Sequence, residues 1–213
     1  MTLFEWQKMP KRREQLLYNC SEYTYMNDEW VPFPIGMSWQ ILNYKGTLED
    51  IQKGPHDNQV LCAIHPRTDD RRRTTGKNRL SILHNLGKNG IHNTGMGNDD
   101  YLRTLTRHQF VISPEGNGID CHRHYEALMA GCIPIVERND KLLEKYGNCP
   151  ILFTDDYSEI KSDYLCKKYL EMLHKTCDFS RLCLDTYDAE TQAQIKMNGN
   201  YWAKRVGGRE WYV

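Results

Sequence analysis

Two loops of this chain carry side chains that suit the binding of an anion. The first, HPRTDDRRRTTGKNR at residues 65–79, follows a short apolar run and holds six basic residues: Arg67, Arg71, Arg72, Arg73, Lys77 and Arg79. Guanidinium groups form bidentate hydrogen bonds to phosphate, and the dipole of a helix that starts after the loop acts on the same anion. We predict a phosphate site that uses Arg67, Arg72, Arg73 and Arg79. A solvated basic loop or a nucleic-acid patch is the alternative, which the neighbouring Asp69 and Asp70 disfavour.

The second loop, SPEGNGID at residues 113–120, precedes a predicted helix. Gly116 and Gly118 let the backbone approach a ligand closely, and the free N–H groups of the helix that begins at Asp120 point toward the same place. Arg123 and Glu126 are three residues apart, so they share one face of that helix. A cation and a carboxylate placed there suit a diphosphate and a ribose hydroxyl pair. A surface salt bridge is the alternative.

Other chemistries fit these residues less well. Gly116, Gly118 and Glu137 match part of a dinucleotide-binding fingerprint, but Cys121 stands at the position of the third glycine. His122 and His124 are two residues apart on a helix and point to different sides, and D-x-D does not occur in the sequence. We therefore predict no metal site and no required cofactor.

The loops must be held by a sheet, and the apolar pattern provides one. Segments with helical spacing of apolar residues alternate along the chain with short apolar runs. The helical segments include Leu80, Leu83 and Leu86, and the apolar residues of 120–131. The predicted strands are 59–64, 109–113, 132–136 and 149–153. This alternation predicts an α/β, Rossmann-like parallel sheet with helices on both faces. In the helix at 120–131, Asp120 is the expected N-terminal cap and Gly131 the expected end.

The ends of the chain have a different character. Residues 1–57 contain a basic segment expected to be helical (8–20) and a proline-rich stretch (29–39) whose prolines argue against a central strand. We therefore divide the chain into an extension at 1–57 and a Rossmann-like domain at 58–213. The last fifty or so residues of that domain are expected to be helical.

Composition excludes several classes of protein. The 28 basic and 28 acidic residues cancel, so no global field would hold nucleic acid or a charged membrane. No window reaches the roughly 18 apolar residues of a membrane helix, and the first residues lack the apolar core of a signal peptide. The eight cysteines are scattered without a C-x-x-C pair, which favours reduced thiols. These features predict a cytoplasmic protein with no nucleic-acid partner.

The run YLRTLTRHQFVISPEGNGIDCHRHYEALMAGCIPIV, residues 101–136, resembles the C-terminal half of exostosin-like glycosyltransferases. That family's pattern is roughly Y-x-x-L-x-x-S-x-F-x-L-x-P-x-G followed by R-x-x-[DE]-A-[IL]-x-x-G-C-I-P-V. The segment TGKNRLSILHNL, 75–86, resembles its G-K-I-R-x-x-L element. The resemblance covers about residues 58–157, and EALMAGCIPIV is its specific part. The run is also similar to fucosyltransferase-like and viral capsid-glycan transferases.

The resemblance implies a GT-B arrangement whose C-terminal domain binds a nucleotide sugar, here a UDP-sugar, with inverting transfer that needs no metal. By matching position, Arg123 would contact the donor diphosphate and Glu126 the ribose or base. Residues 115–118, including Asn117, would lie against the donor sugar. Asp120 would present the helix N-terminus, and Arg79 would face phosphate. Glu115 and Arg123 are the expected catalytic residues, Glu115 as a stabiliser of oxocarbenium character or as the base.

The sequence departs from the family in two respects. His108 stands where the family often has Ser, and 57 residues are too few for an acceptor domain with its own core. Either a partner domain completes the acceptor side, or the N-terminal segment and the C-terminal helices form a minimal one. The expected function is transfer of a sugar to a glycan or protein-glycan acceptor. The alternatives are a non-catalytic nucleotide-binding partner domain, a dinucleotide-dependent oxidoreductase and an RNA-binding module.

Overall fold

Four parallel strands form the centre of the protein. A computed structural model describes residues 10, 12–18, 31–52, 54–70, 73 and 77–212. The strands are β1 (Asn58–Leu61), β2 (His108–Ile112), β3 (Ile133–Glu137) and β4 (Leu152–Thr154), and they lie side by side in chain order. Their register places Val60 beside Phe110, Phe110 beside Ile133 and Ile135 beside Leu152.

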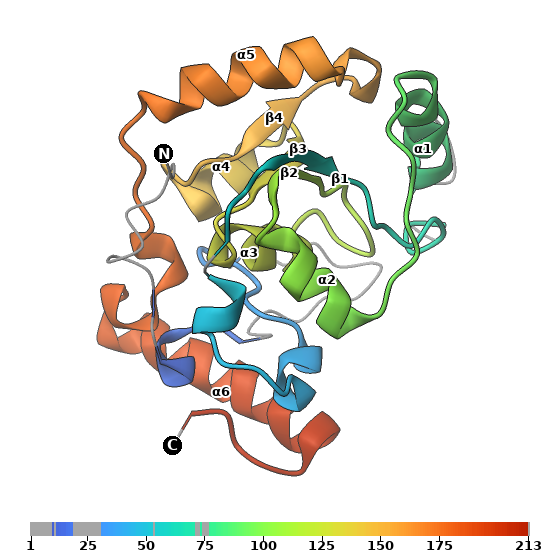
Figure 1. Cartoon of the computed structure of the whole chain (residues 1–213). Coiled ribbons are helices and arrows are strands. Elements are labelled where there is room, and N and C mark those ends of the chain that lie inside the picture. Colours follow the sequence, from blue (N-terminus) through green and yellow to red (C-terminus); the bar gives the residue numbers. More distant parts are fainter. Residues whose placement is uncertain are drawn as a thin grey trace.

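Helices cover both faces of this sheet. Figure 1 shows α5 on one side and α2 and α3 on the other, with α6 farther out beyond α3. The helices are α1 (Arg79–Lys88), α2 (Asn98–Leu105), α3 (His122–Met129), α4 (Asp140–Tyr146), α5 (Ser162–Leu173) and α6 (Ala189–Gly207). The predicted α/β class with a parallel sheet is confirmed, and the strands lie within a few residues of their predicted bounds.

The buried face of α1 differs from the prediction. Leu80 is 51% exposed, whereas Arg79, Ile82 and Leu86 are buried. Asn78 and Ser81 form a capping box that starts the helix at Arg79. Because the Arg79 side chain is held inward by hydrogen bonds, the helix is rotated so that residues three and seven positions later face the core.

The start of α3 also differs from the prediction, although its end agrees. Cys121, not Asp120, occupies the N-terminal cap position, because the Asp120 carboxylate is buried and bonded to other parts of the protein. Gly131 follows the last turn with a φ of 71°, a left-handed conformation that glycine adopts easily. Tyr125 and Leu128 of this helix are fully buried.

The described part of residues 1–57 packs into the same core as the sheet. Residues expected to form a helix at 8–20 contain one short 3₁₀ turn, Arg13–Gln15, after which Leu16 and Tyr18 form isolated β-bridges to Cys183 and Met37. The helix prediction is therefore wrong for the described residues, and the remainder of 8–20 lies outside them. Prolines keep residues 31–38 out of any regular strand, as predicted. The domain boundary at residue 57 stays a prediction.

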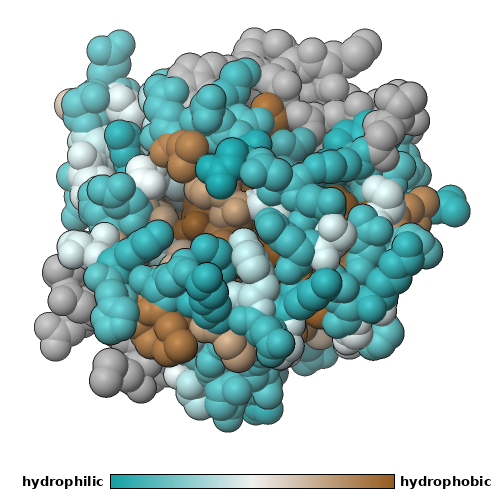
Figure 2. Space-filling model, turned by 90° about the horizontal axis from the view of Figure 1, so that it is seen from above, coloured by the Kyte–Doolittle hydropathy of each residue, from teal (hydrophilic) through white to brown (hydrophobic). Residues whose placement is uncertain are grey.

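The surface above α5 is mainly hydrophilic. In Figure 2, which looks down on that side, hydrophobic residues show only in small areas among hydrophilic ones wherever the residues are described. The coloured part of this face therefore has no large continuous apolar patch of the kind that marks a protein interface. Among the described residues, no helix combines the length and the apolar character needed to cross a membrane.

Candidate active site

A cavity of about 730 Å³ lies where the chain leaves β1 and β2. Parallel strands present their carboxyl ends at one edge, which is where ligands bind in open α/β sheets. Four segments line the cavity, namely parts of residues 35–40, 63–68, 93–98 and 116–126, together with Arg79 and Tyr101. The cavity is therefore built from both predicted loops, and from the N-terminal segment as well.

The first turns of α3 provide a strip of polar side chains on the cavity wall. His122, Arg123 and Glu126 all line it. Residues three or four apart lie on one face of a helix, which explains why these three occur together. His124 points the other way, is fully buried, and bonds through Nε2 to the Ser113 carbonyl at 2.9 Å. The prediction that His122 and His124 point to different sides is confirmed.

Arg123 is a half-buried cation that faces the cavity. Its Nη1 donates to the Ala63 carbonyl oxygen at 2.5 Å, and its guanidinium carbon lies 4.5 Å from the centre of the Tyr101 ring. No carboxylate in the described part of the chain forms an ion pair with it. The side chain is therefore held in place without loss of its charge, which is what an anion site requires.

Glu126, one turn along α3, is a buried carboxylate on the same wall. It is 5% exposed, and its Oε1 accepts a hydrogen bond of 3.4 Å from the backbone N–H of Ser38. The pairing of Arg123 with Glu126 in one cavity agrees with the sequence prediction. Their contact with a nucleotide stays a prediction.

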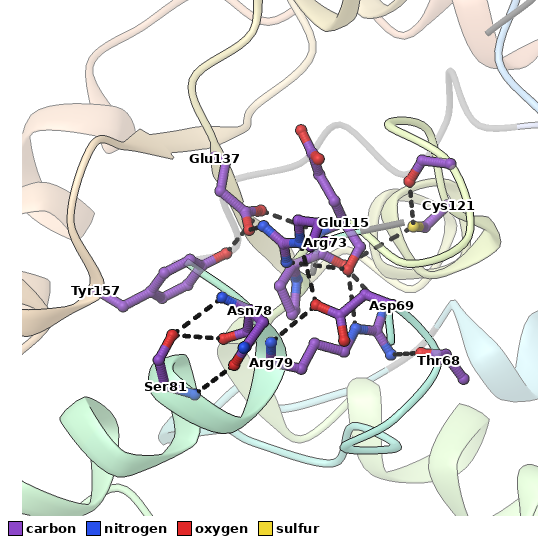
Figure 3. Close-up of polar contacts among 12 residues, drawn as sticks. Thr68, Asp69, Arg73, Asn78, Arg79, Ser81, Glu115, Cys121, Glu137 and Tyr157 are labelled. Carbon is purple, nitrogen blue, oxygen red and sulfur yellow. Dashed lines mark hydrogen bonds and ion pairs between the residues drawn. The ribbon is translucent and has the colours of Figure 1, made fainter. Parts of the chain in front are cut away.

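Arg79 lines the cavity but is engaged with the protein. Its Nε donates to the Glu115 carbonyl at 2.8 Å and its Nη1 to the Thr68 hydroxyl (Figure 3). Nη1 also donates to the His65 carbonyl at 3.1 Å, and Nη2 donates to the Pro114 carbonyl at 2.9 Å. Burial lowers the pKa of Arg79. The Arg79 side chain connects the loop after β1 to the loop after β2. The geometry therefore supports a structural role for Arg79 more directly than the predicted role in binding phosphate.

Arg73 is neutralised by two carboxylates. Its Nε lies 3.0 Å from Asp69 and its Nη1 2.9 Å from Glu137 (Figure 3). Burial alone would lower the pKa of Arg73, but the carboxylates of Glu137, Glu115 and Asp69 together outweigh it and raise the pKa. Glu137 also accepts from the Glu115 backbone N–H at 3.0 Å and the Tyr157 hydroxyl at 3.2 Å. Arg73 does not line the cavity, and Glu137 is used inside the protein instead of facing a ribose.

The remaining predicted residues fall into three groups. Gly116, Asn117 and Gly118 line the cavity. Arg67 is exposed and, like Glu115, is not among the lining residues, while Arg72 lies outside the described residues. The Glu115 backbone joins the Arg79 and Arg73 networks.

Asp120 joins three parts of the protein beneath the cavity. Its carboxylate accepts from the Tyr146 hydroxyl at 2.8 Å and the Ile35 backbone N–H at 2.9 Å, and lies 3.3 Å from Lys145 Nζ. Burial opposes ionisation, but Lys145 and the hydrogen bonds from His124 and Tyr146 outweigh it and lower the pKa of Asp120 to about 2. Asp120 thus fixes the position of the α3 N-terminus.

The sequence did not predict that residues 35–40 form a wall of the cavity, nor that His122 lines it. Ile35, Ser38, Trp39 and Gln40 line the cavity, and Trp39 is 44% exposed. Proline-rich segments give no periodic signal, so only the contacts with α3 reveal this wall. His122 stands four residues before Glu126, which is the spacing that would have placed both on one face.

No group of three or more His, Cys, Asp or Glu side chains in the described residues is arranged to hold a metal ion. The seven cysteines in that part of the chain are free thiols, as predicted: Cys62, Cys121, Cys132, Cys149, Cys166, Cys177 and Cys183. Burial raises the pKa of the Cys121 thiol to about 11, which makes it a poor nucleophile at neutral pH.

Comparison with known proteins identifies the family. The family model of the RXYLT1 C-terminal domain matches residues 70–176, half of the chain. The chain belongs to this family. A search of curated proteins found no match.

The RXYLT1 C-terminal domain is a glycosyltransferase-family domain, so the predicted resemblance to the C-terminal half of exostosin-like transferases is confirmed. The part that matches the RXYLT1 C-terminal domain contains Arg79, residues 116–118 and the strip on α3. The wall at residues 35–40 and the loop after β1 up to Asp69 lie outside the match. The cavity thus combines family residues with a segment that the family model does not describe.

Proposed function

We propose that this protein transfers a sugar from a UDP-sugar to a glycan or protein-glycan acceptor, with inversion at the anomeric carbon and without a metal ion. The observation that carries the proposal is the cavity at the carboxyl ends of β1 and β2, whose α3 wall presents Arg123 and Glu126 within the region that matches a glycosyltransferase family. Its volume, about 730 Å³, is in the range of small-molecule sites.

In the proposed reaction Arg123 stabilises the departing diphosphate. The negative charge on the leaving group grows as the bond to the anomeric carbon breaks, and a preorganised cation lowers the energy of that state. The N-terminus of α3 adds its dipole at the same end of the helix. Glu126 would accept hydrogen bonds from the ribose hydroxyls, and residues 116–118 would lie against the donor sugar.

The other predicted donor residues receive structural roles in this proposal. Arg73 and Arg79 hold the loops that shape the cavity, because their guanidinium groups already bond to protein oxygens. The proposed catalytic role of Glu115 has no support from the cavity, which its side chain does not line. A cytoplasmic location remains part of the proposal and rests on the sequence.

Calorimetric titration with UDP tests the donor site. Arg123→Ala should weaken UDP binding by about 10-fold to 100-fold, because a hydrogen-bonded charge on a phosphate contributes about 1.5–3 kcal/mol. Arg103→Ala, which removes an exposed cation of α2 that does not line the cavity, is the matched control and should bind UDP as the wild type does. Equal affinity of Arg123→Ala and wild type would remove Arg123 from the donor site.

Turnover separates a transferase from a nucleotide-binding partner domain. The wild type should release UDP from one member of a panel of UDP-hexoses and UDP-pentoses in the presence of oligosaccharide acceptors, with or without manganese. UDP binding without any release of UDP from the panel would favour the non-catalytic domain. Release that strictly required manganese would contradict metal-independent transfer.

A further inference from the structure

The N-terminal segment is fixed to the α3 end of the cavity by three hydrogen bonds. Ile35 N donates to Asp120, Ser38 N donates to Glu126, and the Gly36 carbonyl accepts from His122 Nδ1 at 2.9 Å. Gly36 has a φ of 81°, and a Cβ at this position would lie 2.3 Å from the Leu17 carbonyl oxygen. Only glycine fits this conformation and space, so the direction of its carbonyl is set by the fold.

The bond to Gly36 determines which nitrogen of His122 carries a proton. A carbonyl oxygen only accepts, so Nδ1 must be the N–H donor. In the neutral ring Nε2 then has no proton and keeps its lone pair. His122 lines the cavity and is half-buried, so the cavity wall holds an imidazole whose orientation is set by the Gly36 carbonyl.

The other titratable side chains that line the described cavity are less suited to accept a proton. His65 Nδ1 accepts from the Arg67 backbone N–H at 3.3 Å, so its Nε2 carries the proton and acts as a donor. The Asp120 carboxylate is held by Lys145 and Tyr146, and Glu126 is buried against Ser38 N. Among the described residues, His122 makes a hydrogen bond through Nδ1 and none through Nε2, which makes Nε2 the candidate to accept a proton.

We propose that His122 is the general base of the transfer reaction and that residues 35–40 form the acceptor side of the cavity. This inference rests on the proposed transferase function. Nε2 takes the proton of the acceptor hydroxyl while that oxygen forms a bond to the anomeric carbon of the donor sugar. The bond from this carbon to the diphosphate breaks, and its electron pair leaves with UDP. The imidazolium then returns the proton to solvent.

The acceptor wall agrees with this assignment. Trp39 begins the 3₁₀ helix Trp39–Asn43 and presents an aromatic surface to the cavity close in sequence to the Gly36 carbonyl that orients His122. Ser38 and Gln40 add polar groups beside it. A flat apolar surface with neighbouring hydrogen-bonding groups matches the alternating apolar and hydroxyl-bearing faces of a sugar ring.

The test compares His122→Asn with His122→Ala. The Asn side-chain amide reaches the position of Nδ1 and donates to Gly36, so it keeps the tether but removes the base. His84→Asn, on the exposed side of α1, is the matched control. We measure melting temperature, UDP affinity by calorimetry, and UDP release from the UDP-sugar that the wild type uses best. His122→Asn should keep its fold and UDP affinity and lose about 10²-fold to 10⁴-fold in kcat.

Recovery of wild-type kcat in His122→Asn, with His122→Ala slow, would show that the side chain only tethers the segment and would overturn the proposal. A wild type that binds no UDP would instead refute the donor site itself, so the two failures are distinguishable. Should His122→Asn not fold, long-range ¹H–¹⁵N spectra of the wild type decide the matter. A proton on Nε2 of neutral His122 would contradict the assigned role.

Discussion

At the scale of single residues, the three arginines Arg73, Arg79 and Arg123 show why residue type alone does not define a site. Each stands in or after a loop at the carboxyl edge of the sheet, and each was predicted to bind phosphate. Arg73 is paired with carboxylates and Arg79 with backbone carbonyls, whereas Arg123 keeps its charge facing the cavity. What separates them is the supply of protein acceptors around each side chain, which the order of residues does not reveal.

Asp120 provides a prediction about pH. Its pKa is lowered from 3.8 to about 2 in the folded protein. A carboxyl group with a lowered folded pKa contributes stability that is fully present above its unfolded pKa and is lost as pH falls through the folded pKa. Asp120 should therefore contribute about 2 kcal/mol at neutral pH, and this contribution should disappear between about pH 5 and pH 2.

Urea unfolding of wild type and Asp120→Asn at pH 7, 5, 4 and 3 measures this contribution. The variant should be less stable at pH 7 because Lys145 loses its buried partner. The gap in unfolding free energy should narrow as the pH falls, since protonation removes the same charge from the wild type. A gap that stays constant from pH 7 to pH 3 would show that Asp120 titrates normally in the folded state.

At the scale of elements, the sequence predicts what depends on local pattern. The four strands and the helices α3, α5 and α6 follow from runs of apolar residues and from residues such as Gly131 that end a helix. The predicted buried face of α1 was wrong because the charged residue Arg79 is buried, which turns Leu80 toward solvent. The layout of residues 31–52 could not be predicted, because contacts with α3 and α6 fix it and these are distant in sequence.

Two helical glycines test how an element is fixed by its neighbours. An alanine at Gly199 of α6 would place its Cβ 2.7 Å from the Tyr18 carbonyl oxygen and 2.7 Å from the Tyr212 ring. At Gly87 of α1 the same Cβ would meet nothing within 4 Å. Alanine favours a helix over glycine by about 1 kcal/mol, so Gly87→Ala should stabilise the protein by up to that amount.

Gly199→Ala gains the same helix propensity but should destabilise the protein by about 1–3 kcal/mol, because the backbone of Tyr18 cannot give way easily. The melting temperatures of the two variants, measured side by side, should shift in opposite directions. A rise for both would mean that α6 does not pack closely against the N-terminal segment.

At the scale of the whole molecule, hydrogen bonds join residues 16–18 to α3 and to Tyr212. The Tyr125 hydroxyl of α3 accepts from Leu17 N at 3.0 Å and donates to the Leu182 carbonyl. The Tyr212 hydroxyl accepts from Tyr18 N at 3.0 Å and donates to the Leu16 carbonyl at 2.7 Å. These tyrosines and leucines lie in the same buried core as the strands. The described N-terminal residues are therefore part of the hydrophobic core as well as of the cavity wall.

This connection predicts a single cooperative unfolding transition for the chain. Of the five tryptophans, the three among the described residues are Trp39, Trp202 and Trp211. They lie in residues 31–52 and 189–212, which we call the terminal layer, so their fluorescence reports on that layer. Far-UV circular dichroism reports on all helices. In urea the two signals should change together, as they do for one folding unit. Tyr125→Phe should lower both midpoints equally, with a loss of about 1–3 kcal/mol for the unpaired Leu17 N–H and Leu182 carbonyl.

UDP makes this test specific to the cavity. A ligand that binds only the native state raises stability in proportion to the logarithm of its concentration over Kd. Because the cavity takes walls from residues 35–40 and from the sheet loops, saturating UDP should raise both midpoints by the same amount. A fluorescence transition at lower urea that UDP leaves unchanged would mean that the terminal layer unfolds independently, and that the donor site needs only the part of the chain that follows residue 57.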